Sequence, residues 1–145
     1  PPGRLMPTLF TRILDGDLPA RFVWKDDECG AFLSINPLQP GHTLVVPRSE
    51  VDHWIDLAPE QMSPLVRVSQ TIGRALMAAF QPAKVGMTLV GLEVPHVHIH
   101  LVPIRGIFDM DFSKAERNPR EEDLESAAGK IRAALRESGA AQVSD

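Results

Sequence analysis

Residues 94–103 read V-P-H-V-H-I-H-L-V-P, and this stretch constrains the fold more than any other. Histidine and aliphatic residues alternate strictly, and successive side chains of a β-strand point to opposite faces. On a strand, His96, His98 and His100 share one face, with neighbouring imidazoles about 7 Å apart. A helix would spread the three rings around its circumference. The pattern therefore predicts a strand over residues 96–104 with one face lined by histidines and the other facing the core.

Breaks on either side of this stretch divide the chain into further strands. Gly, Pro, Asn and Asp separate short runs of β-branched and apolar residues, a pattern typical of strands joined by turns. The additional predicted strands cover residues 21–25, 30–35, 42–47 and 85–92. Because these strands lie close together in sequence, with one long helical insertion, they favour an α+β fold with an antiparallel sheet.

Three segments carry the apolar spacing of an amphipathic helix. They are residues 8–14, residues 56–80 and a C-terminal helix with Asn118 as N-cap, Pro119 as first residue and Gly139 as its stop. Within the second segment, Pro64 is unsuited to a helix interior. We therefore expect either a kink at Pro64 or a fresh helix start capped by Ser63.

Composition restricts the class of protein. The chain has 145 residues, 43% of them apolar and 23% charged, which fits one globular domain and excludes collagen-like, low-complexity and mostly disordered chains. Apolar runs are too short to span a membrane, and no secretory leader is recognisable. The 15 basic and 19 acidic residues give a net charge of −4, which argues against nucleic-acid binding by charge. Cys29 is the only cysteine, so we expect a small packing residue and a cytoplasmic protein.

Three interpretations of the histidine stripe follow from the residues alone. The imidazoles could be satisfied polar groups on a half-exposed strand. They could hold zinc, with His42 or Glu93 as a further ligand. They could serve phosphate chemistry, since a neutral imidazole is a nucleophile near neutral pH and its neighbours can donate hydrogen bonds to phosphate oxygens.

The motif H-V-H-I-H-L-V resembles the signature of the histidine triad (HIT) superfamily, and in particular its bacterial nucleotide hydrolases and transferases. Residues 31–37 and 40–48 resemble the second block of that family, centred on Pro-Gly-His, and residues 18–27 resemble its opening hairpin. The resemblance covers residues 8 to 105. It implies a five-stranded antiparallel sheet with one longer helix after the third strand and a C-terminal helix. We accordingly divide the chain into a flexible lead (1–7), a HIT domain (8–112) and a C-terminal helical extension (113–145).

The resemblance also implies roles for individual residues. His98, the middle histidine, would attack the α-phosphorus of a nucleotide and form a nucleotidyl-histidine intermediate. The phosphate would lie among His42, His96 and His100. A nucleoside slot would be formed by Leu9, Phe10, Ile13, Phe32, Ser34 and Ile35.

Some positions depart from the family pattern. Ser34 stands where an Asp or Asn usually grips the ribose, and Glu93 stands where a Ser or Thr usually assists the leaving group. Glu93 becomes a candidate general acid if it is buried. Many bacterial relatives carry a Cys-x-x-Cys zinc site; here Thr8 and Thr11 hold those places, and Glu50 replaces a histidine ligand. We therefore expect no structural zinc and no cofactor.

Together these features predict a hydrolase acting at the α-phosphate of a purine nucleoside phosphoramidate or a similar nucleotidyl conjugate. Three alternatives remain open at this point. One is a dinucleoside polyphosphate hydrolase, to which Arg105 could contribute charge. The second is a nucleotide-binding protein with little turnover, and the third is a metal-dependent hydrolase. The expected partners are a purine nucleotide and a second copy of the chain, without a membrane or nucleic acid.

Overall fold

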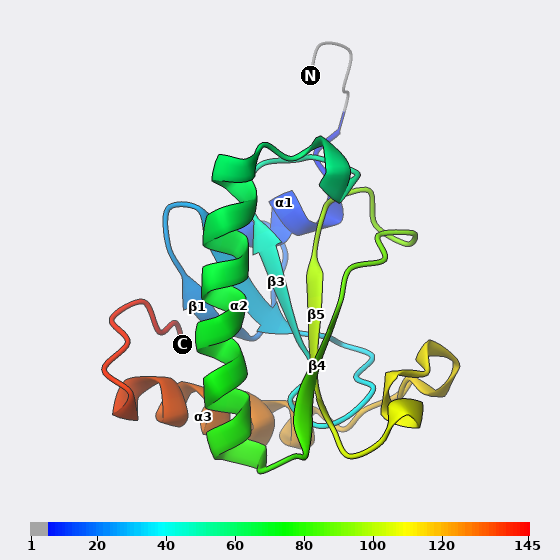
Figure 1. Ribbon diagram of the computed structural model, residues 1–145, viewed down its shortest axis with the longest axis vertical. Helices are drawn as coiled ribbons and strands as arrows, with labels where there is room; N and C mark the ends of the chain where they lie inside the picture. The colour runs from blue at the N-terminus through cyan, green and yellow to red at the C-terminus, as the bar shows by residue number, and fades with distance from the viewer. Residues whose placement is uncertain (1–5) are drawn as a thin grey trace.

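Five short strands form one antiparallel sheet in the order β1-β2-β3-β5-β4 (Figure 1). The computed structural model describes residues 6–145, so most of the predicted lead at 1–7 lies outside the described residues. The strands are β1 (Phe22–Lys25), β2 (Cys29–Leu33), β3 (Thr43–Pro47), β4 (Lys84–Thr88) and β5 (Ile99–Ile104). The α+β class and the five-stranded antiparallel sheet are confirmed.

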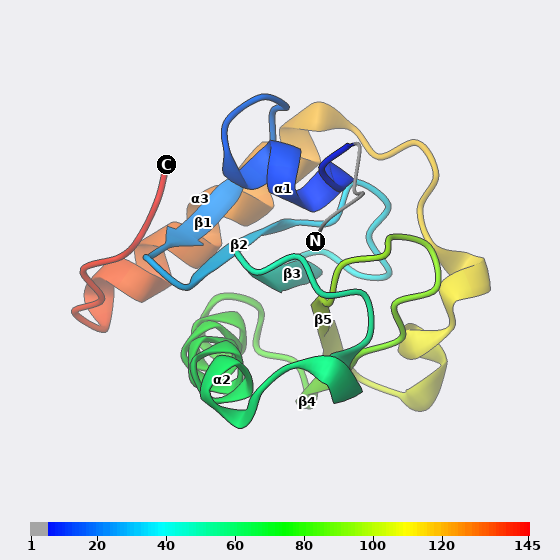
Figure 2. The same cartoon turned by 90° about the horizontal axis from the view of Figure 1, so that it is seen from above.

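Helices cover the two faces of the sheet unequally. The three α-helices are α1 (Leu9–Leu14), α2 (Pro59–Phe80) and α3 (Glu121–Glu137), and short 3₁₀ turns are η1 (Trp54–Asp56), η2 (Ile107–Met110) and η3 (Phe112–Lys114). Figure 2 shows α1 and α2 on opposite sides of the sheet. The long helices α2 and α3 pack on one face, and the six-residue α1 packs on the other.

Each face has its own apolar cluster, as strand alternation requires. The larger cluster packs α2 and α3 against inward-facing residues of four strands, including Val23, Ala31, Val45 and Ile99. The smaller cluster lies under α1 and consists of Phe10, Ile13, Leu14, Phe22, Phe32, Leu44 and Val46. Buried Cys29 belongs to the larger cluster, as expected for a small packing residue.

The fifth strand begins later in the histidine stretch than predicted. β5 begins at Ile99 rather than at residue 96, because the preceding backbone is bonded elsewhere: the Val97 N–H donates to the Val51 carbonyl (2.8 Å) and the His96 N–H to the Val94 carbonyl (2.8 Å). β4 likewise ends at Thr88 rather than at residue 92. Residues 89–98 therefore form a loop that leads into the strand.

Helix starts are the other point of difference. α2 begins at Pro59, not at residue 56, and continues without interruption through Pro64. The C-terminal helix begins at Glu121, with extended Arg120 as N-cap in place of the predicted Asn118. Asn118 is held in a turn before the helix, where its N–H donates to the Glu116 carboxylate (3.0 Å).

The C-terminal segment closes one edge of the sheet. Lys25 N–H donates to the Gln142 carbonyl (3.0 Å), and Ser144 N–H donates to the Val23 carbonyl (3.2 Å). Arg132 on α3 reinforces this junction, since its Nε donates to the carbonyls of both Phe22 and Ser144 at 2.8 Å. α3 contributes to the same core cluster as the sheet. The division into a HIT domain (8–112) and a C-terminal extension (113–145) remains a prediction. None of the helices within residues 6–145 has the length and apolar character needed to cross a membrane.

Candidate active site

His98 lies immediately before β5, on the face of the sheet that α1 covers. Its Nδ1 is 2.8 Å from the backbone carbonyl of His96. A carbonyl only accepts hydrogen bonds, so Nδ1 carries the proton and donates it to that carbonyl. A neutral His98 therefore has its lone pair on Nε2, the arrangement that a nucleophile requires.

Two further histidines form a hydrogen-bonded row. The Leu38 N–H donates to His42 Nδ1 (3.0 Å), so the proton of a neutral His42 is on Nε2. His42 Nε2 lies 2.9 Å from His100 Nδ1 and donates to it. A neutral His100 then carries its own proton on Nε2. The row thus fixes His100 as a hydrogen-bond donor next to the lone pair of His98, whose ring centroid is 4.8 Å from that of His100.

Burial keeps these imidazoles neutral at pH 7. It lowers the pKa of His42 to about 3, aided by the nearby His100 and His98. Burial also lowers the pKa of His100 to about 4, with a contribution from His98. The pKa of His98 is lowered by burial as well, although its hydrogen bond to the His96 carbonyl and the charge of Glu93 act in the opposite direction. Neutrality allows one ring to attack while the other donates.

Aromatic rings pack against His98 and His100. Phe10 on α1 meets the His98 ring edge to face, with centroids 4.8 Å apart. Phe112 on η3 meets the His100 ring in the same way at 5.0 Å. These contacts hold the two imidazoles between α1 and the η2–η3 segment, which Figure 2 shows at well-separated places around the sheet.

His96 and His42 require a correction, because both were predicted to surround the phosphate. His96 is fully buried, and both of its ring nitrogens are engaged: Nε2 lies 2.7 Å from the Pro47 carbonyl and Nδ1 lies 2.6 Å from Thr8 Oγ1. His42 is only 2% exposed, and its nitrogens are bonded to Leu38 and His100. In the structure the nitrogens of both rings are engaged with other protein groups, whereas Nε2 of His100 carries a proton that the His42 contact does not use.

The first residues of α1 form a polar cluster with His96. Thr8 Oγ1 lies 3.2 Å from Thr11 Oγ1, and the Thr8 N–H donates to Glu50 Oε1 (2.6 Å). Thr8, Thr11 and Glu50 stand at the positions for which the family resemblance implies zinc ligands in many bacterial relatives. Two threonine hydroxyls, one carboxylate and one histidine do not fit the thiolate and imidazole sets that structural zinc prefers, and residues 6–145 contain no group of three His, Cys, Asp or Glu placed to hold a metal.

The predicted nucleoside residues divide into two groups. Phe10, Ile13 and Phe32 are brought together in the smaller apolar cluster beside His98. Leu9 and Ile35 lie on the surface, Ile35 with 70% of its area exposed. Half-buried Ser34 accepts a hydrogen bond from the Asn36 N–H (3.2 Å).

A cavity of about 520 Å³ borders this region. It lies between the β2–β3 loop and the start of α3, and its lining includes Ser34, His42, Lys114 and Asp123. Its walls also include Leu33 and Leu124, which belong to the larger core cluster. The cavity therefore approaches the site from the α3 side of the sheet.

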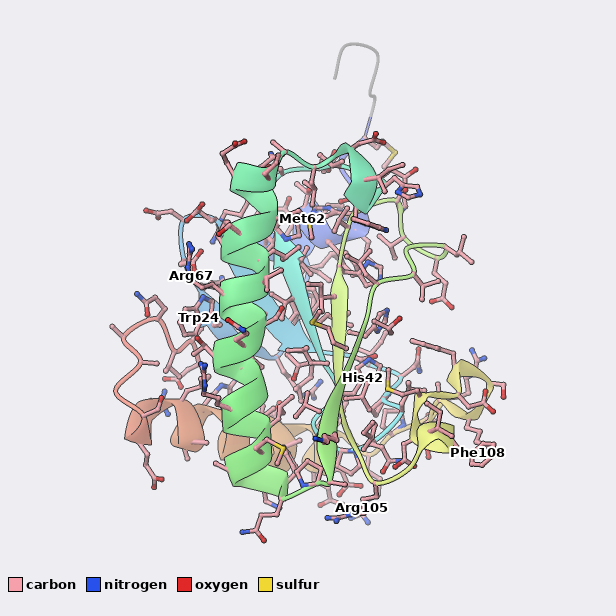
Figure 3. All side chains as sticks on the ribbon, in the orientation of Figure 1. Trp24, His42, Met62, Arg67, Arg105 and Phe108 are labelled. Carbon is pink, nitrogen blue, oxygen red and sulfur yellow. The ribbon has the colours of Figure 1, made fainter. Side chains whose placement is uncertain are left out.

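Glu93 and Arg105 do not lie where their predicted roles, general acid and phosphate-binding cation, would require. Glu93 is exposed, so the burial on which a general-acid role depended is missing. Arg105 Nη2 lies 3.1 Å from the Gln81 carbonyl and 3.5 Å from the Phe80 carbonyl, at the end of α2. Figure 3 shows Arg105 at the foot of the molecule, well below His42.

Several contributors to the site had not been identified from the sequence. They are the Leu38 amide, the Pro47 carbonyl and the Phe112 ring. The turn at Pro40-Gly41 gave a usable signal for the first, because Gly41 (φ 93°) folds the backbone so that residue 42 returns to residue 38. Phe112 had no such signal, since it lies in short 3₁₀ turns without periodicity.

Comparison with known proteins places this geometry in a family. The model of the HIT domain matches residues 15–107. An uncharacterized HIT-like protein of Mycobacterium tuberculosis is 30% identical over 141 residues, covering 94% of this chain and 98% of the relative.

Solved structures agree with this assignment. A zinc-bound histidine triad family protein from Mycobacterium smegmatis superposes with a TM-score of 0.79 at 29% identity, over 92% of this chain and 96% of that one. A HIT family hydrolase from Legionella pneumophila gives a TM-score of 0.58 at 25% identity, over 66% of this chain and 91% of that one. The match of the domain model over most of the chain, together with the triad geometry, shows that this protein belongs to the HIT domain family.

Proposed function

We propose that this protein hydrolyses a nucleotide conjugate at its α-phosphate, with a purine nucleoside phosphoramidate as substrate and His98 as nucleophile. The observation that carries the proposal is the hydrogen-bond arrangement of the three rings. It presents an unprotonated Nε2 on His98 next to a protonated Nε2 on His100. The HIT family hydrolase from L. pneumophila gives independent support for a hydrolytic activity.

The first step forms a covalent intermediate. The Nε2 lone pair of His98 attacks the α-phosphorus, a P–Nε2 bond forms, and the P–N bond to the leaving amine breaks. The departing amine takes its proton from solvent, because a neutral imidazole is too weak an acid to give one up. His100 keeps its Nε2 proton and donates a hydrogen bond from it to a phosphate oxygen, where negative charge increases in the transition state.

The second step restores the enzyme. Water attacks the phosphorus of the nucleotidyl-histidine, the P–Nε2 bond breaks, and the attacking water releases one proton to solvent, which balances the proton taken up in the first step. The products are a nucleoside monophosphate and an amine, and both histidines regain their starting protonation. The division into two displacements lowers the barrier because the protonated imidazole of His98 is a good leaving group at phosphorus.

Binding of the nucleoside is proposed on the α1 side of the row. Phe10, Ile13 and Phe32 supply an apolar wall beside His98, and the exposed apolar side chains of Leu9 and Ile35 remain candidates for contact with the base. Ser34 remains the candidate for contact with the ribose. The apolar wall suits the flat face of a purine.

The other readings find less support. A dinucleoside polyphosphate would need cations for its additional phosphates, whereas Arg105 is engaged with the α2 carboxyl end. A metal site on the stripe would need ring nitrogens of His96 and His42, which are bonded to protein groups. A homodimer and a cytoplasmic location remain predictions; equilibrium sedimentation of the purified protein tests the first.

The decisive experiment is single-turnover cleavage of a fluorogenic adenosine phosphoramidate by wild type, His98→Ala and a matched control, His53→Ala. His53 is exposed and its Nδ1 accepts a hydrogen bond from the Ile55 N–H in η1. We expect His98→Ala to lower the rate by about 10⁴-fold or more, as removal of a covalent nucleophile does. His53→Ala and added chelator should leave the rate unchanged.

Two further readouts separate the alternatives. Acid-quenched wild type should carry one adenylyl group on the peptide that contains His98, detected by mass spectrometry. A wild type that binds AMP but neither turns over nor becomes labelled would instead support the binding-only reading. Retention of activity by His98→Ala within tenfold would refute the assignment of the nucleophile.

A further inference from the structure

Thr8 occupies a junction between three parts of the chain. Its hydroxyl accepts the Thr11 N–H (3.1 Å) and so caps the start of α1. The same oxygen lies 2.6 Å from His96 Nδ1. Its backbone N–H donates to Glu50 Oε1 (2.6 Å) in the segment after β3. One residue therefore connects α1, the segment after β3 and the triad loop.

The contact with His96 completes the fixation of that ring. The Pro47 carbonyl holds Nε2 at 2.7 Å, and Thr8 holds Nδ1 at 2.6 Å from the other side. An imidazole held at both nitrogens cannot rotate about its Cβ–Cγ bond without losing two hydrogen bonds. The backbone carbonyl of His96 itself accepts the hydrogen bond from the Nδ1–H of His98.

Thr8 also governs where α1 lies against the row. Two residues further along, Phe10 meets the rings of His96 (5.8 Å) and His98 (4.8 Å) edge to face. α1 has only six residues, too short to be stable by itself, so its position depends on anchors such as this cap. The Thr8 hydroxyl thus affects the position of two groups that contact His98: the His96 carbonyl and the Phe10 ring.

From these contacts we propose that Thr8 is a positioning residue for the reaction, whose hydroxyl fixes the orientation and tautomer of His98 through His96. The kinetic part of this proposal rests on the proposed function, whereas the tautomer of His98 can be measured without any substrate.

The test compares Thr8→Val, which keeps the shape but removes the hydroxyl, with Thr8→Ser, which keeps the hydroxyl. Thr71→Val is the matched control, since it makes the same change on α2, where the Thr71 hydroxyl donates to the Arg67 carbonyl (3.2 Å) and not to a histidine. Thr8→Gly is a second variant that removes the hydroxyl while keeping a residue favourable at a helix start. Long-range ¹H–¹⁵N correlation reports the tautomer of His98, and single-turnover cleavage reports the first step.

We expect Thr8→Val and Thr8→Gly to raise the fraction of His98 protonated at Nε2 and to lower the first-step rate by about 10-fold to 100-fold, the usual loss when an outer partner that orients a histidine is removed. Thr8→Ser should restore both within about threefold, and Thr71→Val should resemble wild type. The proposal is overturned if folded Thr8→Val or Thr8→Gly keeps the wild-type tautomer, or if Thr71→Val loses as much rate as Thr8→Val. A wild type that lacks phosphoramidase activity would refute the proposed function and leave the tautomer measurement intact.

Discussion

Acid should destabilise this protein through its buried histidine pair. The perturbation is a change from pH 7 to pH 5 in wild type and in His42→Asn, a variant that keeps an acceptor for the Leu38 N–H but cannot titrate. Burial lowers the pKa of His42 from 6.5 to about 3. The unfolded chain therefore takes up a proton at this position below pH 6.5, whereas the folded chain resists protonation until about pH 3. Stability is consequently lost as the pH falls through this window.

The magnitude follows from the shift. Each pH unit inside the window costs about 1.4 kcal/mol for one proton, so the interval from pH 6.5 to pH 5 costs about 2 kcal/mol. His100 acts in the same direction because its pKa is lowered to about 4. The two rings share a hydrogen bond, so their contributions are not additive. His42→Asn should therefore be less sensitive to acid than wild type by about 2 kcal/mol.

Urea unfolding at pH 5, 6, 7 and 8 measures this difference. Trp24 is buried and gives a fluorescence signal for the core. His53→Asn serves as control, because it removes an exposed imidazole and should leave the loss between pH 7 and pH 5 as in wild type. If the free energies of unfolding of wild type and His42→Asn fall in parallel, within about 0.5 kcal/mol, the inference that His42 is held neutral by burial is wrong.

Three other outcomes are expected. Cys29 should react with a thiol reagent only as the protein unfolds, because burial raises the pKa of its thiol from 9.0 to about 12, which leaves about 1000-fold less thiolate; rapid labelling of the native protein at pH 8 would contradict this. Gly41→Ala should lower the free energy of unfolding by about 1–3 kcal/mol, since the φ of Gly41 is 93° and an added Cβ would meet the Phe80 ring at 2.6 Å. The control Gly73→Ala, whose added Cβ has no neighbour within 4 Å, should not destabilise the protein in the same urea titration. Phe112→Ala should lower the single-turnover rate about 3-fold to 10-fold by loosening the third triad histidine, and an unchanged rate would show that the ring does not position it.

Much of the architecture could be predicted because it follows from local patterns. The strict alternation at residues 96–101 correctly placed Ile99 and Leu101 in the core and His98 and His100 on the opposite face. Turn residues separated the strands, and apolar spacing located all three α-helices. The boundaries were less accurate at residues whose backbone groups bond to distant segments, as the Val97 N–H does to Val51.

The roles of individual histidines could not be predicted because they depend on which groups meet after folding. His96 and His42 have the same residue type as His98, yet only the fold brings Thr8 and Pro47 to one and the Leu38 amide to the other. The family pattern identified the set of residues, and the hydrogen-bond partners distinguish the proposed nucleophile, His98, from the rings proposed to position it.

The pairing of residues 142–144 with β1 has a consequence for how the protein folds. An edge strand with unpaired N–H and C=O groups is a template for aggregation. Here the edge strand β1, near the N-terminus of the chain, is protected by residues 142–144, near the C-terminus. Closure of so long a loop is slow relative to formation of the β1–β2 hairpin. Folding intermediates should therefore expose this edge until α3 docks, and removal of residues 140–145 should increase light scattering during refolding more than it lowers the activity of the folded protein.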